Sequence, residues 1–353
     1  MNLRSIFKLA ALLLICTSCD SKPSSEKSEE LLPFVSSLTI DTIGTFEEEF
    51  LFAKEFLVYN DSILITLNKP HQDGYFIEFY NLVNKKNIGQ LFKYGNGPKE
   101  MLSAIIYLNQ NQLYVNDYVK AQLAIVNMDS INDINLYNIQ VWNHQVMSSP
   151  TAVICDDKFV LEDPFYFEDS RYNIKQGKSR LITTDGKQPY KHDKYEYYTR
   201  NVNVDGCIIT NENLQRIMYA PLHYSIVELY DYQLNHIKTF EKFPPIEREY
   251  RIKSAEGSSV EDLLFKKNIP FAYLGYTTDS SYVYLVYMGT LWMDGTKMED
   301  YPNWILKFDW DCNLIDKYYI NDYILSISKS PRKDIFYITV KNEEGNPILL
   351  KLQ

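Results

Sequence analysis

The chain has 353 residues, 29 of them tyrosine, and a formal net charge of −10 at pH 7. This acidic composition argues against binding to nucleic acid and against an electrostatic hold on anionic lipid, because both need clustered cations. Beyond residue 19 the cysteines are Cys155, Cys207 and Cys312, and this odd number without CxxC spacing fits neither a disulfide framework nor a zinc site.

The N-terminal segment has the order of a bacterial lipoprotein leader. Arg4 and Lys8 precede an apolar run at residues 9–15 that is too short to span a bilayer. Small residues follow this run before Cys19. The order resembles a lipobox, although Cys16 stands where a leucine is usual. Residues 1–18 are therefore expected to be a signal peptide. Cys19 is expected to be lipidated and to hold the protein to a membrane of the cell envelope, in the periplasm or at the cell surface. An ordinary secretory signal that ends nearby is the alternative.

Residues 19–33 are expected to be a tether that follows the lipidated cysteine. Ser, Lys, Glu and Pro dominate from Asp20 to Glu30 without an apolar residue, which is typical of a solvated segment. Roughly 320 residues remain, a length that large all-β folds often reach as one domain. We expect a single domain over residues 34–353, acting as a monomer.

A repeated strand pattern organises this domain. An apolar strand ends near Asp or Asn, a short turn follows, and another strand begins. Two further strands precede each such hairpin, so that each unit has four strands, A to D. Where no insertion intervenes, successive turns are about 46 residues apart. This spacing is in the range of four-stranded propeller blades. The residues that lead these turns are Asn81, Asn127, Asp185, Asp231 and Asp309.

The glycine-rich stretch "LFKYGNGPKEML", residues 91–102, lies between strand D of the first unit and strand A of the second. A phosphate-binding loop needs GxxxxGK[ST] before a helix, and neither that ending nor a helix follows. Glycine permits unusual backbone angles, and Pro98 disfavours helix at Gly97. We therefore interpret Gly95, Gly97, Pro98 and Glu100 as a structural corner.

Residues 246–267 interrupt the repeat. The segment is charged, and Val260, Leu263, Leu264 and Phe265 have near-helical spacing. It is predicted to be an insertion between the fourth and fifth units that forms a short helix.

The last unit supplies only three strands, "YILSISKS", "DIFYITVK" and "PILLKLQ". A missing outer strand leaves an open edge, and the segment "SLTIDTIG", residues 37–44, has no other partner. The sequence thus predicts an all-β, six-bladed β-propeller with four antiparallel strands per blade, closed by an N-terminal strand in the last blade.

The second unit carries a family resemblance. The corner GxGPxE followed by "IIYLNQNQLYVNDYVKAQLAIVNMD" resembles an NHL-type repeat. With the lipoprotein leader and six blades, residues 34–353 resemble the TolB-like six-bladed propeller lipoproteins of Bacteroidetes. The resemblance implies a fold and a compartment, and it implies no reaction.

Catalytic and metal-binding motifs are not found. The five histidines show no HxxxH or HExxH pairing, and neither a GxSxG elbow nor an EF-hand loop occurs. No cofactor and no metal are predicted. Propeller enzymes can gather single residues from many blades around one channel, so an enzyme stays open.

One face of the predicted propeller carries the candidate site. The turns between strands B and C and the corners between D and the next A lie on the same face, and those B–C turns are long and aromatic in blades three and five. Aromatic platforms with a few polar groups suit a sugar ring or a peptide. Alternatively, the aromatics pack these loops onto the blades. The candidate ligand-binding residues are His71, Asp117, Lys120, Phe165, Arg171, His223, Trp292 and Tyr301.

Two classes of function follow from this interpretation. The first is a membrane-anchored binding module that holds a glycan, a peptide or a protein partner on this face. The second is a channel-mouth enzyme, a lyase or hydrolase, that acts on saccharides.

Overall fold

The computed structural model describes the strands, most of their connections and none of residues 1–39. The described residues are 40–44, 53–69, 74–133, 139–144, 152–162, 167–169, 174–176, 180–187, 206–243, 246, 250–254, 261–265, 268–292, 297, 301–332 and 335–353. The chain divides into two units between Pro33 and Phe34, and all described residues belong to the second. The predicted signal peptide, tether and Cys19 therefore lie outside the described residues.

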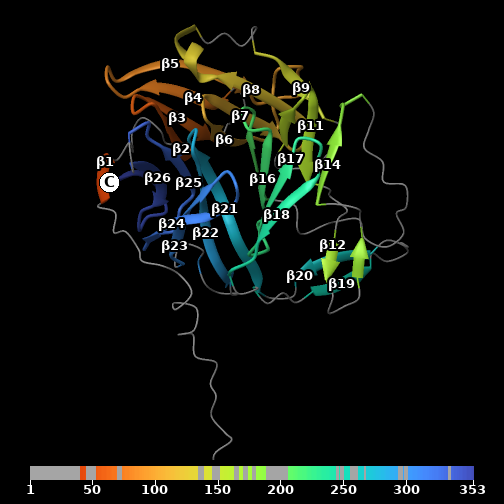
Figure 1. Ribbon diagram of the computed structural model, residues 1–353. Coiled ribbons are helices and arrows are strands. Elements are labelled where there is room, and N and C mark those ends of the chain that lie inside the picture. The colour runs from red at the N-terminus through yellow and green to blue at the C-terminus, as the bar shows by residue number, and fades with distance from the viewer. Residues whose placement is uncertain are drawn as a thin grey trace, which may run out of the picture. The chain divides into compact units, whose positions relative to one another are not determined.

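The second unit is a six-bladed β-propeller (Figure 1). Five of its sheets have four antiparallel strands, and the described part of blade three has three. In order from A to D, blade one contains β2 (Ala53–Tyr59), β3 (Ile63–Asn68), β4 (Tyr75–Asn81) and β5 (Lys86–Lys93), and blade two contains β6 (Ile105–Asn109), β7 (Gln112–Asp117), β8 (Gln122–Asn127) and β9 (Val141–Asn143). Blade three contains β10 (Ala152–Cys155), β11 (Lys158–Glu162) and β14 (Leu181–Thr184), and blade four contains β15 (Cys207–Asn211), β16 (Arg216–Ala220), β17 (Val227–Asp231) and β18 (His236–Phe240). Blade five contains β21 (Ile269–Thr278), β22 (Tyr282–Trp292), β23 (Asn303–Asp309) and β24 (Leu314–Ile320), and blade six contains β25 (Ser326–Lys329), β26 (Phe336–Lys341), β27 (Pro347–Leu352) and β1 (Ile40–Gly44).

The ring is closed by the N-terminal strand, as predicted. β1 pairs antiparallel with β27, from Ile40 opposite Leu352 to Gly44 opposite Leu349. Blade six therefore combines both ends of the domain in one sheet, and β1 covers the edge that β27 alone would expose.

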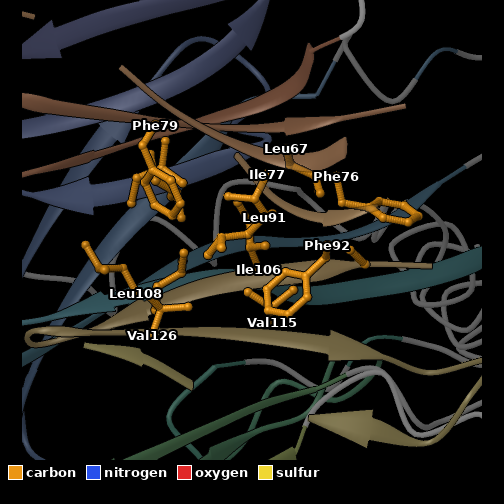
Figure 2. Close-up of a cluster of buried hydrophobic side chains, with 14 of the residues drawn as sticks. Leu67, Phe76, Ile77, Phe79, Leu91, Phe92, Ile106, Leu108, Val115 and Val126 are labelled. Atoms are coloured by element: carbon orange, nitrogen blue, oxygen red, sulfur yellow. The ribbon is translucent and has the colours of Figure 1, made fainter. Parts of the chain in front are cut away.

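The blades are held together by their apolar faces. Each strand alternates apolar side chains between its two faces, so that each sheet packs against the sheets on both sides. Figure 2 shows this packing between blades one and two, where Leu91 and Phe92 meet Ile106, Val115 and their neighbours. All four of these side chains are buried.

The predicted turn-leading residues all act in the same way. Each side-chain oxygen accepts a backbone N–H two residues later, as in the bond from Gln233 N to Asp231 Oδ1 of 3.0 Å and the bond from Asp311 N to Asp309 Oδ1 of 3.0 Å. Asn81, Asn127 and Asp185 make the equivalent bond. These side chains stabilise the tight turns between strands C and D together with backbone bonds such as Leu234 N to Asp231 O. After Asn127 the chain continues into a short 3-10 segment, Met128–Asp133.

Two small hairpins lie outside the six blades. β12 (Phe167–Asp169) pairs with β13 (Ile174–Gln176) between strands B and C of blade three, and β19 (Tyr250–Ser254) pairs with β20 (Glu261–Phe265) between blades four and five. The prediction of a short helix within residues 246–267 was therefore wrong for residues 250–254 and 261–265, which are strands. Tyr250 and Ile252 alternate with Arg251 and Lys253, which is the period of a strand, and the apolar cluster at 263–265 is too short to establish a helical period.

Candidate ligand-binding face

The strand order gives the propeller two different faces. Because neighbouring strands of each blade are antiparallel, all A–B and C–D turns lie on one face and all B–C turns and D–A corners on the other. We call these the turn face and the loop face. Both extra hairpins, β12–β13 and β19–β20, are connections of the loop face.

The loop face also carries an extension of blade five. β21 and β22 pair from Thr278 opposite Val283 as far as Ile269 opposite Trp292, whereas β22 and β23 pair only as far as Tyr287 opposite Trp304. The end of β22 therefore continues beyond β23 as a two-stranded ribbon with the start of β21. A β-carbon at Gly289, which has φ of 65°, would lie 2.4 Å from the Tyr287 ring, so this position requires glycine.

The opposite end of the ring is bridged by hydrogen bonds across its axis. Asn109 at the end of β6 donates to the carbonyl and to the hydroxyl of Thr210, both at 3.1 Å, and accepts from the Thr278 hydroxyl at 2.9 Å. These three buried residues belong to blades two, four and five. In addition, β21 packs against β6, although their blades are on opposite sides of the ring. Access to the ring's interior is therefore restricted at the turn face.

Glu55 lies at the loop-face end of an inner strand. It is in β2, where the pairing with β3 has a register shift between Ala53 and Glu55, and its side chain is half-buried. Burial raises the pKa of its carboxyl to about 7, and the adjacent Lys54 only partly opposes this. Sequence reasoning missed this residue, and the signal available was one carboxylate inside the largely apolar strand "AKEFLVY".

The corner residues form a compact hydrogen-bonded unit. The Glu100 carboxylate accepts the Gly97 N–H at 2.7 Å, and Met101 N donates to Lys93 O at 2.9 Å. A β-carbon on Gly95 would lie 2.1 Å from Glu100 Oε2, so the folded carboxylate occupies the space of a side chain at that position. This stretch is a turn between two blades, built around one carboxylate.

Two of the predicted ligand-binding residues hold this same corner. The buried Asp117 carboxylate accepts bonds from Leu102 N and the Ser103 hydroxyl, both at 2.7 Å, and from the backbone of its own B–C turn. The Lys120 ammonium donates to Gly97 O at 2.8 Å and to Glu100 O at 2.6 Å. Both side chains therefore join the B–C turn of blade two to the preceding corner.

Three further predicted residues lie at or against the ribbon of blade five. His223 is buried, and its Nδ1 bonds to the carbonyl of Pro270 at 2.5 Å, which attaches the B–C turn of blade four to β21. Trp292 at the end of β22 and Tyr301 before β23 are both half-buried at the ribbon of blade five. His71, Phe165 and Arg171 lie outside the described residues.

An exposed aromatic patch on the loop face was also missed. Tyr94 in the corner is 43% exposed, and Tyr118 and Val119 in the adjoining B–C turn are 38% and 41% exposed. Lys120 connects the two segments, so these side chains belong to one fixed surface. The sequence could have revealed them as apolar residues within polar turns.

A second buried carboxylate lies between blades three and four. Glu162 accepts a hydrogen bond from the Tyr219 hydroxyl at 2.6 Å and from Gly206 N at 2.8 Å. Burial, followed by the charge of Glu162, raises the pKa of Tyr219 well above its usual value, so this phenol remains a donor.

Among the described residues, no three His, Cys, Asp or Glu side chains are grouped so that they could hold a metal ion. In the described part of the chain, no helix is long and apolar enough to cross a membrane.

Comparison with known proteins agrees with this architecture. A family model for the TolB-like 6-blade propeller-like fold matches residues 48–330. A crystal structure of a DUF4221 family member from Bacteroides vulgatus is similar with a TM-score of 0.55 at 11% identity, and the match covers 91% of this chain and 97% of that one. A presumed exported protein from Bacteroides fragilis has a TM-score of 0.47 at 11% identity, with 90% and 94% covered. No curated protein matches the sequence significantly.

Proposed function

The chain belongs to the TolB-like 6-blade propeller-like family, and we propose that it acts as a binding module. In this proposal the protein is anchored to a membrane of the cell envelope through Cys19. It holds a glycan, a peptide or a protein partner on the loop face.

The observation that carries this proposal is the difference between the two faces. The loop face bears two additional hairpins, the ribbon of blade five and the exposed Tyr94 and Tyr118. The turn face has mainly short turns, and Asn109 bridges blades at that end of the axis. Aromatic side chains offer large contact area at low conformational cost, which favours the loop face as a binding surface.

The entry point of the chain supports the same orientation. Ile40 pairs with Leu352, the last residue of strand C in blade six, so the chain enters the propeller on the turn face. In this proposal an anchor that precedes Ile40 would leave the loop face available to partners in solution.

The anchor has a direct test. Cys19→Ser removes the sulfur that would carry the acyl chain, so the protein should move from the membrane fraction of its host to the soluble fraction. Mass spectrometry should show the loss of the lipid. Unchanged membrane retention and mass would refute the anchor.

The binding face can be tested on glycan and peptide arrays with the full-length protein. We expect Trp292→Ala, Tyr301→Ala and Tyr118→Ala each to lower affinity by on the order of 1–3 kcal/mol for a side chain that contacts ligand, with little change in thermal stability. Leu214→Ala and Val83→Ala are the matched controls, since both are exposed apolar residues in turns of the other face. If the loop-face variants unfold the protein and spare binding, these aromatics are scaffold and the proposal fails.

The saccharide lyase or hydrolase is supported by a single observation. Glu55 has a pKa of about 7, which suits a general acid or base at neutral pH. If that function is correct, Glu55→Gln should abolish saccharide cleavage while saccharide binding persists.

A further inference from the structure

We propose that Glu55 is the recognition group of the ring's interior and that it receives a cationic group. The ligand is then a peptide or protein segment with a basic side chain or a free amine, and not a neutral glycan. This inference rests on the proposed function and specifies which of its ligand classes the site takes.

The position of Glu55 is the first step. β2 is the inner strand of blade one and packs against β25, the inner strand of blade six. The register shift between Ala53 and Glu55 falls at the loop-face end of β2, and such irregularities commonly redirect a side chain beside a functional site. The far end of the axis is bridged through Asn109, so a ligand reaches Glu55 from the loop face.

The Glu55 carboxylate has no partner in the described part of the fold. Among the described residues Glu55 makes no hydrogen bond and no ion pair, whereas Glu100, Asp117 and Glu162 each accept at least one bond within the fold. A half-buried carboxylate without a partner loses hydration and gains nothing in return. It therefore costs stability unless a ligand supplies the missing donor.

The surrounding charges do not compensate for Glu55. The strands of blade six that pack against β2 carry Lys329 on β25, Tyr337 and Lys341 on β26, and Lys351 on β27, but they meet the side of β2 that bears Phe56 and Val58, whereas alternation places Glu55 on the other side with Leu57. Lys329 donates to the carbonyls of Ser330 and Arg332, and Tyr337 donates to Asp61. Only Lys54 on the same strand acts on the Glu55 carboxyl, and it does not offset burial.

A cationic group satisfies this environment better than a hydroxyl does. An ammonium or guanidinium supplies both charge and N–H donors, and charge-assisted bonds are roughly twice as strong as neutral ones. The chain's net charge of −10 also attracts cationic ligands over a longer range.

The test uses the full-length protein and two small probes of the same shape, N-acetyl-arginine amide and the neutral N-acetyl-citrulline amide. The carboxyl carbon of Glu55 is observed by 13C NMR and identified by its absence in Glu55→Gln. We expect the arginine probe to lower the pKa of Glu55 by about one unit or more, since an adjacent cation favours the ionised form. For a shift of one unit, affinity for the arginine probe should be about fivefold weaker at pH 6 than at pH 8, and the citrulline probe should show neither effect.

The variants separate a specific site from general attraction to an acidic protein. Glu55→Gln should lower affinity for the arginine probe at least tenfold. Glu212→Gln removes the same charge from an exposed turn of the other face and should leave affinity unchanged. An unchanged Glu55 titration with the arginine probe, or equal affinity in Glu55→Gln, would overturn the inference.

The arrays distinguish this inference from the proposed function. Glycan binding that requires Tyr118 and is unaffected by Glu55→Gln would overturn the cationic ligand and leave the binding face intact. Binding of basic peptides that both substitutions abolish would support the two together. Loss of array binding only in the turn-face variants would overturn the proposed face, and the NMR titration would still decide the role of Glu55.

Discussion

The Glu100 carboxylate explains why the first corner of the propeller contains two glycines. It folds back on the turn to accept Gly97 N, and it occupies the space that side chains at Gly95 and Gly97 would need. Asp117 and Lys120 then fix the neighbouring turn to this corner through backbone groups. At some positions of the loop face, charged side chains therefore form hydrogen bonds with backbone groups, whereas Glu55 has no such bond among the described residues.

This arrangement predicts coupling between Gly97 and Glu100. A β-carbon at Gly97 would lie 2.9 Å from Glu100 Oε2 and displace the carboxylate. Gly97→Ala should therefore break the hydrogen bond from Gly97 N to Glu100 and lower the free energy of unfolding by roughly 1–2 kcal/mol. Glu100→Ala should cost a similar amount. The double variant should cost little more than either single one in chemical denaturation, because both remove the same interaction. Additive costs would contradict this account.

His144 gives the stability a dependence on pH. It is buried against Phe159, and burial lowers the pKa of its imidazole to about 4, with Asp117 opposing the shift. Because this folded-state pKa lies below the ordinary 6.5, the unfolded state binds the proton more readily between these values. Stability should therefore fall as pH drops from about 6.5 to 4, by up to about 3 kcal/mol from this residue. Denaturation at pH 5 and pH 7 should show a smaller difference for His144→Gln than for the natural chain, and an equal difference would contradict a buried neutral histidine.

At the scale of elements, the repeat was predictable because its determinants are local. The alternation of each strand and the Asp or Asn that leads each C–D turn are visible within one unit of sequence, as Asp231 and Asp309 illustrate. The β19–β20 hairpin was mistaken for a helix because a short apolar cluster does not define a period. The burial of Glu55 could not be predicted, because it depends on neighbouring strands that meet β2 only in the folded ring.

The closing strand is the element whose loss should matter most. Deletion of residues 34–45 removes β1, exposes the edge of β27 and loses its ladder of hydrogen bonds at roughly 1 kcal/mol each. Thermal unfolding should drop by on the order of 10 °C, or the protein should aggregate. Deletion of residues 20–31 is the control, since it shortens the predicted tether and leaves β1. An unchanged melting temperature after the first deletion would show that β1 does not support the ring.

At the scale of the whole molecule, the two faces have different roles in this account. The chain enters on the turn face at Ile40, and the same end of the axis is bridged by Asn109. The loop face gathers the added hairpins, the exposed tyrosines and the approach to Glu55. The strand order alone therefore makes the two faces of the propeller different.

The most direct test of the binding face works even while the ligand is unidentified. A photo-crosslinking amino acid is placed at Tyr118 on the loop face or at Leu214 on the turn face, two positions that are 38% and 51% exposed. After irradiation of the living host, the protein is purified and its covalent adducts are identified by mass spectrometry. The account predicts a specific adduct from position 118 and none from position 214. Adducts from position 214 without any from position 118 would contradict it.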